Sequence, residues 1–105
     1  MRDTPGTVYL LHFTKGVPRM GTLGVWHYLG WAREGCLEKR LARHAQPRTE
    51  VTLLRELHRL GGRFQLARTW PGETPDDERR RKKNGHIGAL CPICRGNPAP
   101  LEDMG

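Results

Sequence analysis

The sequence predicts a small α+β domain whose elements follow the order β-β-α-α-β-α. Three observations predict it: two strand-length runs of β-branched and aromatic residues near the N-terminus, two middle segments with a helical spacing of leucine, and a sharply capped polar helix after a third strand. With 105 residues, of which 36% are hydrophobic, the chain is long enough for one domain with a single modest core.

Composition predicts the first two strands. The run Thr7–Phe13 is dense in β-branched, aromatic and aliphatic residues and follows the turn signal Pro5-Gly6. The run Val25–Trp31 has the same character. The connection between the two runs is rich in glycine and contains a proline. We therefore expect an antiparallel hairpin with a long loop.

Two helices are expected next. The segment Cys36–Ala45 places apolar residues four apart, with basic residues on the remaining faces, and Pro47 ends it. Leucines at three-and-four spacing then continue until Gly61-Gly62, and Thr49 is the predicted N-cap of this second helix. We expect this pair of helices to supply much of the core.

A third strand and a third helix complete the order. The segment Arg63–Trp70 alternates apolar and polar residues, as a strand does, and Pro71-Gly72 is expected to end it. Thr74 is the predicted N-cap of the last helix, with Pro75 at its first position and two aspartates near the positive end of the helix dipole. Asn84-Gly85 is expected to end this helix.

The chain is expected to divide into a folded domain over residues 1–85 and a C-terminal segment, 86–105, that contains two cysteines and ends in a flexible tail. No run approaches the roughly 20 apolar residues of a membrane span, and the N-terminus lacks the apolar core of a secretory signal. An odd number of cysteines does not suggest a secreted disulfide framework. We therefore expect a cytoplasmic protein with no membrane partner.

The charge of the chain favours a polyanionic partner. Eighteen lysines and arginines against eleven aspartates and glutamates give a formal net charge of +7. Most of the basic residues are arginines, whose planar guanidinium matches a phosphate in a bidentate way. Nucleic acid is the expected partner, without a small-molecule cofactor. A solvated basic surface with no partner is the alternative.

Five polar residues stand in an informative order along the predicted elements. Tyr9 and Tyr28 lie on the first two strands, Arg40 and His44 lie one turn apart on the first helix, and Glu78 lies on the last helix. Taken singly, each has an ordinary explanation as a packed tyrosine or a surface polar residue. Taken together, they are what a small nuclease needs to bind one divalent cation and hydrolyse a phosphodiester.

With a tyrosine on each of its first two strands, the chain resembles the GIY-YIG nuclease domain over about residues 7–84. Thr7-Val8-Tyr9 stands at the first motif of the family and Tyr28-Leu29-Gly30 at the second. Arg40-Leu41-Ala42-Arg43-His44 resembles the Arg-x-x-x-His stretch of its first helix. Thr7 replaces the glycine of the first motif, and Asn84 is better explained as a helix-ending residue than as the family's late asparagine. The resemblance implies a central three-stranded antiparallel sheet flanked by helices, and a divalent-metal-dependent endonuclease that cuts DNA.

The resemblance also implies roles for the five residues. Glu78 would bind Mg²⁺ or Mn²⁺, which keeps most of its waters. Tyr9 would be the base that activates water, with Tyr28 as the second phenol, and a phenol can do this only if nearby cations favour the phenolate. Arg40 would supply that field and clamp the scissile phosphate. His44 would donate a proton or hold a phosphate.

Four further basic residues are expected to contact nucleic acid: Lys39 and Arg43 on the first helix, and Arg81 and Lys82 on the last. Either of the last two could instead pair with Glu78. The alternative to a nuclease is a non-catalytic nucleic-acid-binding or adapter protein on the same fold, with or without a stabilising zinc ion. The sequence leaves a monomer and a homodimer, and DNA and RNA, open.

Cys91-Pro-Ile-Cys94 has the spacing of half a zinc site, and a structural zinc site normally has four ligands. His86 is the candidate third ligand, with Cys36 or another histidine as the fourth if the segment folds back on the domain. The alternative is a reduced, partly exposed pair of thiols. His12 and His27, beside the two tyrosines, are not assigned a role.

Overall fold

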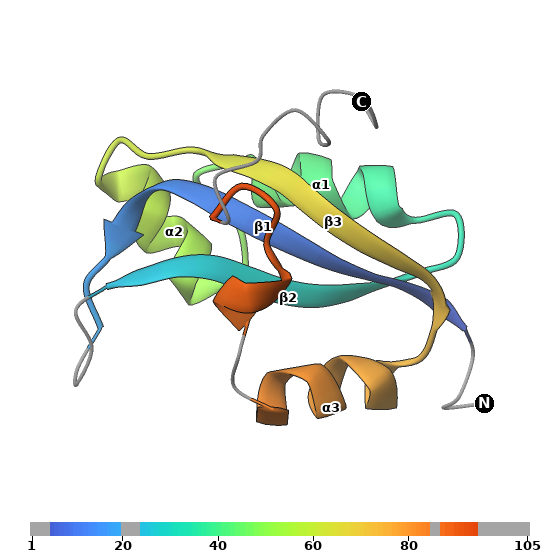
Figure 1. Cartoon of the computed structure of the whole chain (residues 1–105). Helices are drawn as coiled ribbons and strands as arrows, with labels where there is room; N and C mark the ends of the chain where they lie inside the picture. The colour runs from blue at the N-terminus through green and yellow to red at the C-terminus, as the bar shows by residue number, and fades with distance from the viewer. Residues whose placement is uncertain (1–4, 20–23, 85–86, 95–105) are drawn as a thin grey trace.

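The structure is a computed structural model that describes residues 5–19, 24–84 and 87–94. Its elements, shown in Figure 1, are β1 (Gly6–Val17), β2 (Val25–Arg33), α1 (Leu37–His44), α2 (Thr52–Arg59), β3 (Phe64–Glu73), α3 (Pro75–Asn84) and the one-turn 3₁₀ helix η1 (Ile87–Leu90). The predicted order β-β-α-α-β-α is confirmed. Among the described residues, no helix has the length and apolar character needed to cross a bilayer.

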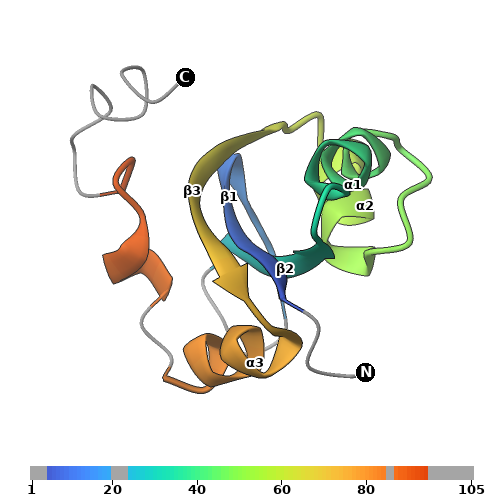
Figure 2. The ribbon, with the colours of Figure 1, turned by 90° about the vertical axis from the view of Figure 1, so that its right-hand side faces the viewer.

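The three strands form one sheet in the order β2-β1-β3, and β1 pairs antiparallel with both neighbours. Figure 2 shows α1 and α2 on one face of this sheet and η1 on the other, with α3 below the layers in that view. The predicted antiparallel hairpin and the three-stranded antiparallel sheet are therefore confirmed. The central strand is flanked by paired neighbours and covered on both faces.

The central strand β1 is buried on both faces because alternate side chains of a strand point to opposite sides. Tyr9, Leu11 and Phe13 pack toward α1 and α2, on what we call the helix face. Val8 and Leu10 pack toward η1, on what we call the η1 face. The other buried core residues are Val17, Ala32, Leu53, Leu54 and Leu57 on the helix face, and Leu29, Ala67 and Cys91 on the η1 face.

The prediction that Pro71-Gly72 ends the third strand is wrong. β3 continues to Glu73, with Pro71 opposite Thr7 and Glu73 opposite Gly6, so Gly72 is an extra residue in the ladder. Its φ of 78° suits the left-handed conformation that a bulge requires. A proline is tolerated because β3 is an edge strand.

The two predicted helix caps have different outcomes. Thr49 is not the N-cap of α2, which begins at Thr52 after Val51; instead Thr49 is buried and its Oγ1 accepts the backbone N–H of Val51 at 3.3 Å. Thr74 is confirmed as the cap of α3. Its Oγ1 accepts the N–H of Asp77 at 3.3 Å, while Asp77 Oδ2 accepts the N–H of Thr74 at 2.9 Å.

Of the predicted C-terminal segment 86–105, the structure describes residues 87–94, while His86 and the expected flexible tail lie outside the described residues. The described part packs on the η1 face of the sheet, where Cys91 is buried. Arg68 on β3 reaches this part too, since its Nη1 donates to the Leu90 carbonyl at 3.4 Å. The segment after α3 therefore contributes to the core.

Candidate functional site

Both tyrosines and His44 meet on the helix face of the sheet. The Tyr9 hydroxyl oxygen lies 2.7 Å from His44 Nε2. The ring of Tyr28 is centred 6.2 Å from the Tyr9 ring and 5.5 Å from the His44 ring. Residues from β1, β2 and the end of α1 thus form one contact cluster.

A glycine in β2 makes room for the Tyr9 phenol. Gly30 is the register partner of Tyr9 across the β1–β2 ladder. A Cβ at Gly30 would lie 2.5 Å from the Tyr9 hydroxyl oxygen, closer than any real contact of this kind. The glycine of Tyr28-Leu29-Gly30 therefore has a steric reason: it lets the phenol lie across the neighbouring strand and reach His44.

His44 is held as a neutral imidazole. Its side chain is buried, and burial lowers its pKa to about 4, helped by the charges of Arg40 and Arg43. A neutral imidazole can accept the Tyr9 hydroxyl proton at Nε2, leaving Nδ1–H to face Thr49 Oγ1 at 3.5 Å. His58 Nε2 donates to the His44 carbonyl oxygen at 2.8 Å, which fixes the end of α1.

The phenols carry raised pKa values in this environment. Burial raises the pKa of Tyr9 well above its usual range, and the neighbouring Tyr28 adds to the shift, while Arg40 acts in the opposite direction. Burial also raises the pKa of Tyr28, against the effect of Lys82. The cationic field expected from the sequence is present, but burial outweighs it, and both phenols are protonated at neutral pH.

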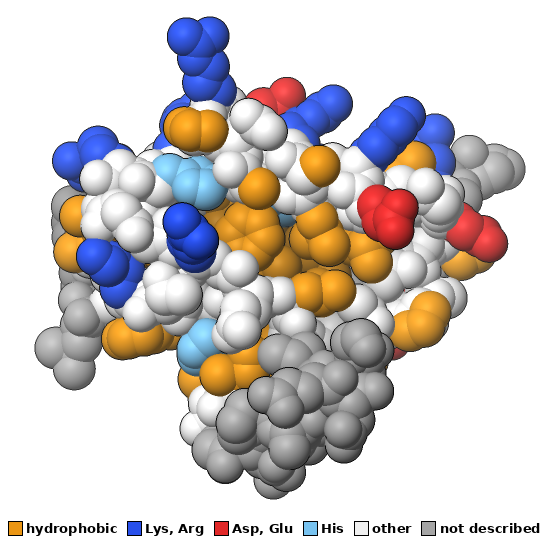
Figure 3. Space-filling model, turned by 90° about the horizontal axis from the view of Figure 1, so that it is seen from above, with side chains coloured by type: hydrophobic (Ala, Val, Ile, Leu, Met, Phe, Trp, Pro, Cys, Tyr) orange, Lys and Arg blue, Asp and Glu red, His pale blue; other side chains and the backbone are white. Residues whose placement is uncertain are grey.

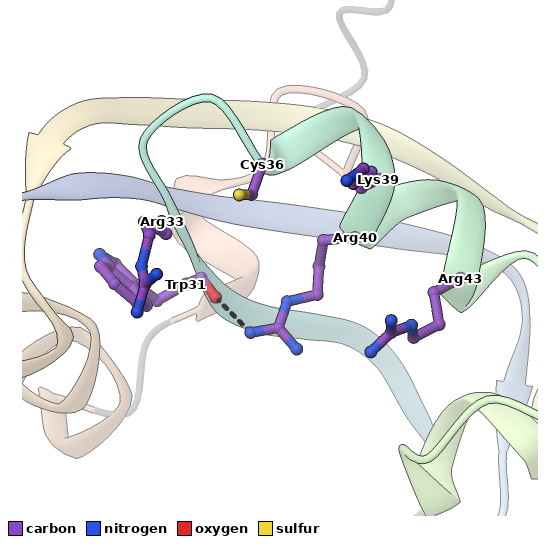
Figure 4. Close-up of a pocket in the computed structure, with 6 residues that line it drawn as sticks. All are labelled: Trp31, Arg33, Cys36, Lys39, Arg40 and Arg43. Carbon is purple, nitrogen blue, oxygen red and sulfur yellow. Dashed lines mark hydrogen bonds between the residues drawn. The ribbon is translucent and has the colours of Figure 1, made fainter.

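Arg40 belongs to a pocket of basic side chains on α1. Its Nη2 donates to the Trp31 carbonyl at 3.3 Å, as Figure 4 shows. The pocket has a volume of about 310 Å³. It is lined by Trp31, Arg33, Cys36, Lys39, Arg40 and Arg43. Since four of these six residues are cations and none is acidic, the pocket suits a phosphate group.

Basic side chains also stand at the edge of the molecule. In Figure 3, lysine and arginine side chains stand around the upper and left margins of the view, while apolar side chains gather in its middle. Lys39 and Arg43, both expected to contact nucleic acid, line the pocket together with Arg40.

α3 brings Glu78 and Lys82 to the two phenols. Glu78 acts electrostatically on both tyrosines, raising the pKa of each, and Lys82 Nζ lies 5.7 Å from the centre of the Tyr28 ring. Lys82 also pairs with Glu78, with 2.7 Å between Nζ and Oε2. Glu78 therefore joins Tyr9, Tyr28, Arg40 and His44 in what we call the polar cluster. One of its carboxylate oxygens pairs with Lys82.

Arg81 lies apart from this cluster. Its Nε and Nη2 donate to the two carboxylate oxygens of Glu73 at 3.0 and 2.7 Å. Its guanidinium also stacks on Trp70, 4.3 Å from the ring centre. These contacts join α3 to the end of β3, so Arg81 acts as a structural link in the free protein.

A second cluster, which we call the His/Cys cluster, lies on the η1 face. It consists of His12, His27, Cys91 and Cys94, whose ligand atoms all lie within 4.8 Å of one another, and it could hold a metal ion such as zinc. The sequence offered Cys36 or another histidine as the fourth ligand. The cluster contains histidines and not Cys36, which lines the pocket on α1. The predicted third ligand, His86, lies outside the described residues.

Sequence reasoning did not assign His12 and His27 as ligands. The two histidines are direct register partners across the β1–β2 ladder, so their side chains emerge side by side on one face. Burial lowers the pKa of both, which keeps the imidazoles neutral. The sequence did contain a signal: His12 is two residues from Leu10, and His27 is two residues from Leu29. Residues two apart on a strand share a face, and Leu10 and Leu29 lie on the face that Cys91 covers.

Comparison of the chain with family models, curated proteins and solved structures finds no match in any of the three. The function is therefore inferred from the two clusters and the basic pocket. One cluster joins phenols, imidazole, guanidinium and carboxylate, and the other joins imidazoles and thiols.

Proposed function

We propose that the chain is a divalent-metal-dependent endonuclease of the GIY-YIG type that hydrolyses phosphodiester bonds in DNA. The observation that carries the proposal is the hydrogen-bonded pair of Tyr9 and His44 within reach of the charges of Arg40 and Glu78. These groups come from β1, α1 and α3, and Tyr28 joins them from β2. A tyrosine buried only for packing would also need a hydrogen-bond partner, but it would not need the charges of Arg40 and Glu78 around that pair.

The pair of Tyr9 and His44 can move the proton of the attacking water. As the water oxygen forms its bond to phosphorus, its proton passes to the Tyr9 oxygen while the Tyr9 proton passes to His44 Nε2. The bond to the sugar oxygen breaks, and that oxygen leaves with the bonding electron pair and takes a proton from a solvent water, whose hydroxide is neutralised by the proton on His44. The raised pKa of Tyr9 makes a free phenolate costly. Simultaneous transfer to a neutral His44 avoids that phenolate.

The basic pocket can hold the substrate. Arg40 offers its guanidinium to the scissile phosphate, while Lys39 and Arg43 line the same hollow and can neutralise neighbouring phosphates. The substrate backbone would then run along α1 toward Tyr9. Lys82, beside the Tyr28 ring, adds a cation on the α3 side of the same cluster.

Glu78 fits the expected Mg²⁺ or Mn²⁺ as a single carboxylate ligand. Its side chain is 17% exposed, so one oxygen can reach an ion while the carboxylate stays on the protein surface. Mg²⁺ and Mn²⁺ keep several waters and take few carboxylates from a protein. When bound, the cation would neutralise charge on the phosphate. Lys82, which pairs with Glu78 in the free protein, would give up that carboxylate oxygen to the cation.

The direct test compares plasmid cleavage by the wild-type protein and by Glu78→Gln in Mn²⁺. We expect the wild-type protein to nick supercoiled DNA, chelation to abolish this, and Glu78→Gln to lower the rate by about 100-fold or more. The matched control is Glu34→Gln, an exposed residue in the turn between β2 and α1, which should cleave at the wild-type rate. Equal rates for wild-type and Glu78→Gln proteins would contradict the proposal.

A second candidate is a non-catalytic nucleic-acid-binding or adapter protein on the same fold. The observation that favours it is the pairing of Glu78 with Lys82, which leaves the carboxylate neutralised without a metal ion. Such a protein would bind DNA with strong salt dependence and leave the backbone intact in Mg²⁺ and Mn²⁺. The same plasmid assay separates the two candidates.

A further inference from the structure

We propose that His12, His27, Cys91 and Cys94 form a structural Zn²⁺ site that fastens the segment after α3 to the η1 face of the sheet. This site is separate from the polar cluster of Tyr9 and His44, and it does not depend on the proposed nuclease function. It unites two strand residues with two residues that follow η1.

Three distances within the His/Cys cluster are close to the edges of a zinc tetrahedron. Zinc bonds of about 2.0–2.1 Å to nitrogen and about 2.3 Å to sulfur give edges of about 3.3 Å between nitrogens and about 3.6 Å between nitrogen and sulfur. His12 Nδ1 lies 3.4 Å from His27 Nε2 and 3.5 Å from Cys91 Sγ. Cys94 Sγ lies 3.6 Å from His12 Nδ1 and 3.0 Å from His27 Nε2. Three of these four edges agree with zinc, and the fourth is shorter.

The backbone fixes these ligands in place. His12 and His27 are opposed across the β1–β2 ladder, so the sheet itself sets the separation of the two imidazoles. Cys91 is buried, its N–H donates to the Gly88 carbonyl at 3.2 Å, and its Sγ accepts the N–H of Cys94 at 3.5 Å. A backbone N–H to sulfur contact stabilises a thiolate, the form that binds metal.

The ligand set selects zinc among the common metals. Two thiolates and two imidazoles in a tetrahedral arrangement suit Zn²⁺, whereas Mg²⁺ and Ca²⁺ require oxygen ligands. Four protein ligands fill the coordination shell and leave no position for water or substrate, which is the pattern of structural rather than catalytic sites. Two thiolates also neutralise the charge of the ion on the partly apolar η1 face.

The segment that the zinc would fasten is shallowly packed: of its described residues, 87–94, only Cys91 is buried. None of residues 75–83 in α3 is buried, so this helix contributes little hydrophobic contact. Beyond it, Ile87, Leu90 and Ile93 are only partly buried against the η1-face core. Metal bonds at Cys91 and Cys94 would supply the missing stabilisation, and they would also fix the C-terminal end of α3, the helix that carries Glu78.

The test is the metal content of protein purified in reducing buffer without chelators or metal-affinity resin. We expect about one zinc ion per chain by elemental analysis, lost in the Cys91→Ser, Cys94→Ser double variant. The control is Cys36→Ser, a cysteine outside the cluster, which should keep its zinc. Chelation should lower the melting temperature of the wild-type protein by about 10 °C or more and leave the double variant unaffected.

A measurement on the wild-type chain covers the case in which the double variant does not fold. Exchange with Co²⁺ should give the intense visible bands of a tetrahedral site together with sulfur-to-cobalt charge transfer, and both should weaken in His12→Asn. Folded wild-type protein without zinc and without a tetrahedral Co²⁺ spectrum would overturn the proposal. A disulfide between Cys91 and Cys94 in the reduced preparation, or zinc lost equally in Cys36→Ser, would overturn it as well.

Discussion

At the scale of single residues, burial governs the chemistry of the polar cluster. Burial raises the pKa of Tyr9 and lowers that of His44. The pair therefore joins a protonated phenol to a neutral imidazole whose Nε2 can accept a hydrogen bond. Neither residue type predicts this, because a tyrosine and a histidine on the surface would titrate independently. The residues could be proposed from their order in the sequence. Their protonation states could not be predicted in this way, because they depend on how deeply the surrounding residues bury each side chain.

The lowered pKa of His44 predicts a pH dependence of stability. A histidine whose pKa is about 4 in the folded state and about 6.5 when unfolded binds a proton more readily after unfolding. Stability from this residue is therefore complete above about pH 6.5 and lost as the pH falls toward 4, by at most about 3 kcal/mol. Chemical denaturation of wild-type and His44→Gln proteins at pH 7 and pH 5 measures the difference. We expect the glutamine variant to lose less stability on acidification, and equal losses would contradict the assignment.

At the scale of elements, the sequence predicts the type and order of the three strands and three α-helices, but not η1 or the details that depend on contacts with other elements. The dipeptide Pro71-Gly72 is compatible with either the end of a strand or a bulge within it. Only the pairing of β3 with β1 decides between the two. Thr49 is of a residue type favoured at helix N-caps, but its hydroxyl contacts the backbone N–H of Val51 and the imidazole of His44 instead. The meeting of His12 and His27, the proposed zinc ligands, depends on the register of the hairpin, which composition does not specify.

The register of β1 and β2 also predicts the effect of Gly30→Ala. The new methyl group would force the Tyr9 phenol away from Gly30 and from His44. We expect cleavage to fall by about 100-fold, because small misplacements of catalytic groups are costly, and the melting temperature to fall by several degrees. Gly88→Ala is the control, since its Cβ would be 4.0 Å from the nearest atom, His27 Cε1. Wild-type cleavage by Gly30→Ala would show that Tyr9 need not touch His44.

The basic pocket of α1 predicts a change in salt dependence. Arg43→Gln should weaken DNA binding and reduce the slope of log affinity against log salt by about one, because one phosphate contact is lost. Arg59→Gln, an exposed residue on α2 that pairs with Glu56, removes the same charge elsewhere and should change the slope less. Fluorescence anisotropy across a salt series measures both. Equal changes in the two variants would argue against a defined phosphate path along α1.

At the scale of the whole molecule, the sheet separates two sites and α3 connects them. The polar cluster lies on the helix face and the His/Cys cluster on the η1 face. α3 carries Glu78 to the first and leads through η1 to the second, so its position depends on both ends. The resemblance in sequence points to the polar cluster, and the spacing of Cys91 and Cys94 points to half of the His/Cys cluster. The two histidines of that cluster follow from the packing of the segment after α3 against the strands.

The single measurement that tests the central claim most directly is the single-turnover cleavage rate of Tyr9→Phe in Mn²⁺. This change removes one hydroxyl and keeps the buried ring, so the fold and the DNA affinity should stay close to those of the wild-type protein. We expect the rate to fall by about 100-fold or more, because the water loses the group that takes its proton. A Tyr9→Phe protein that cleaves DNA as fast as the wild type would contradict the account.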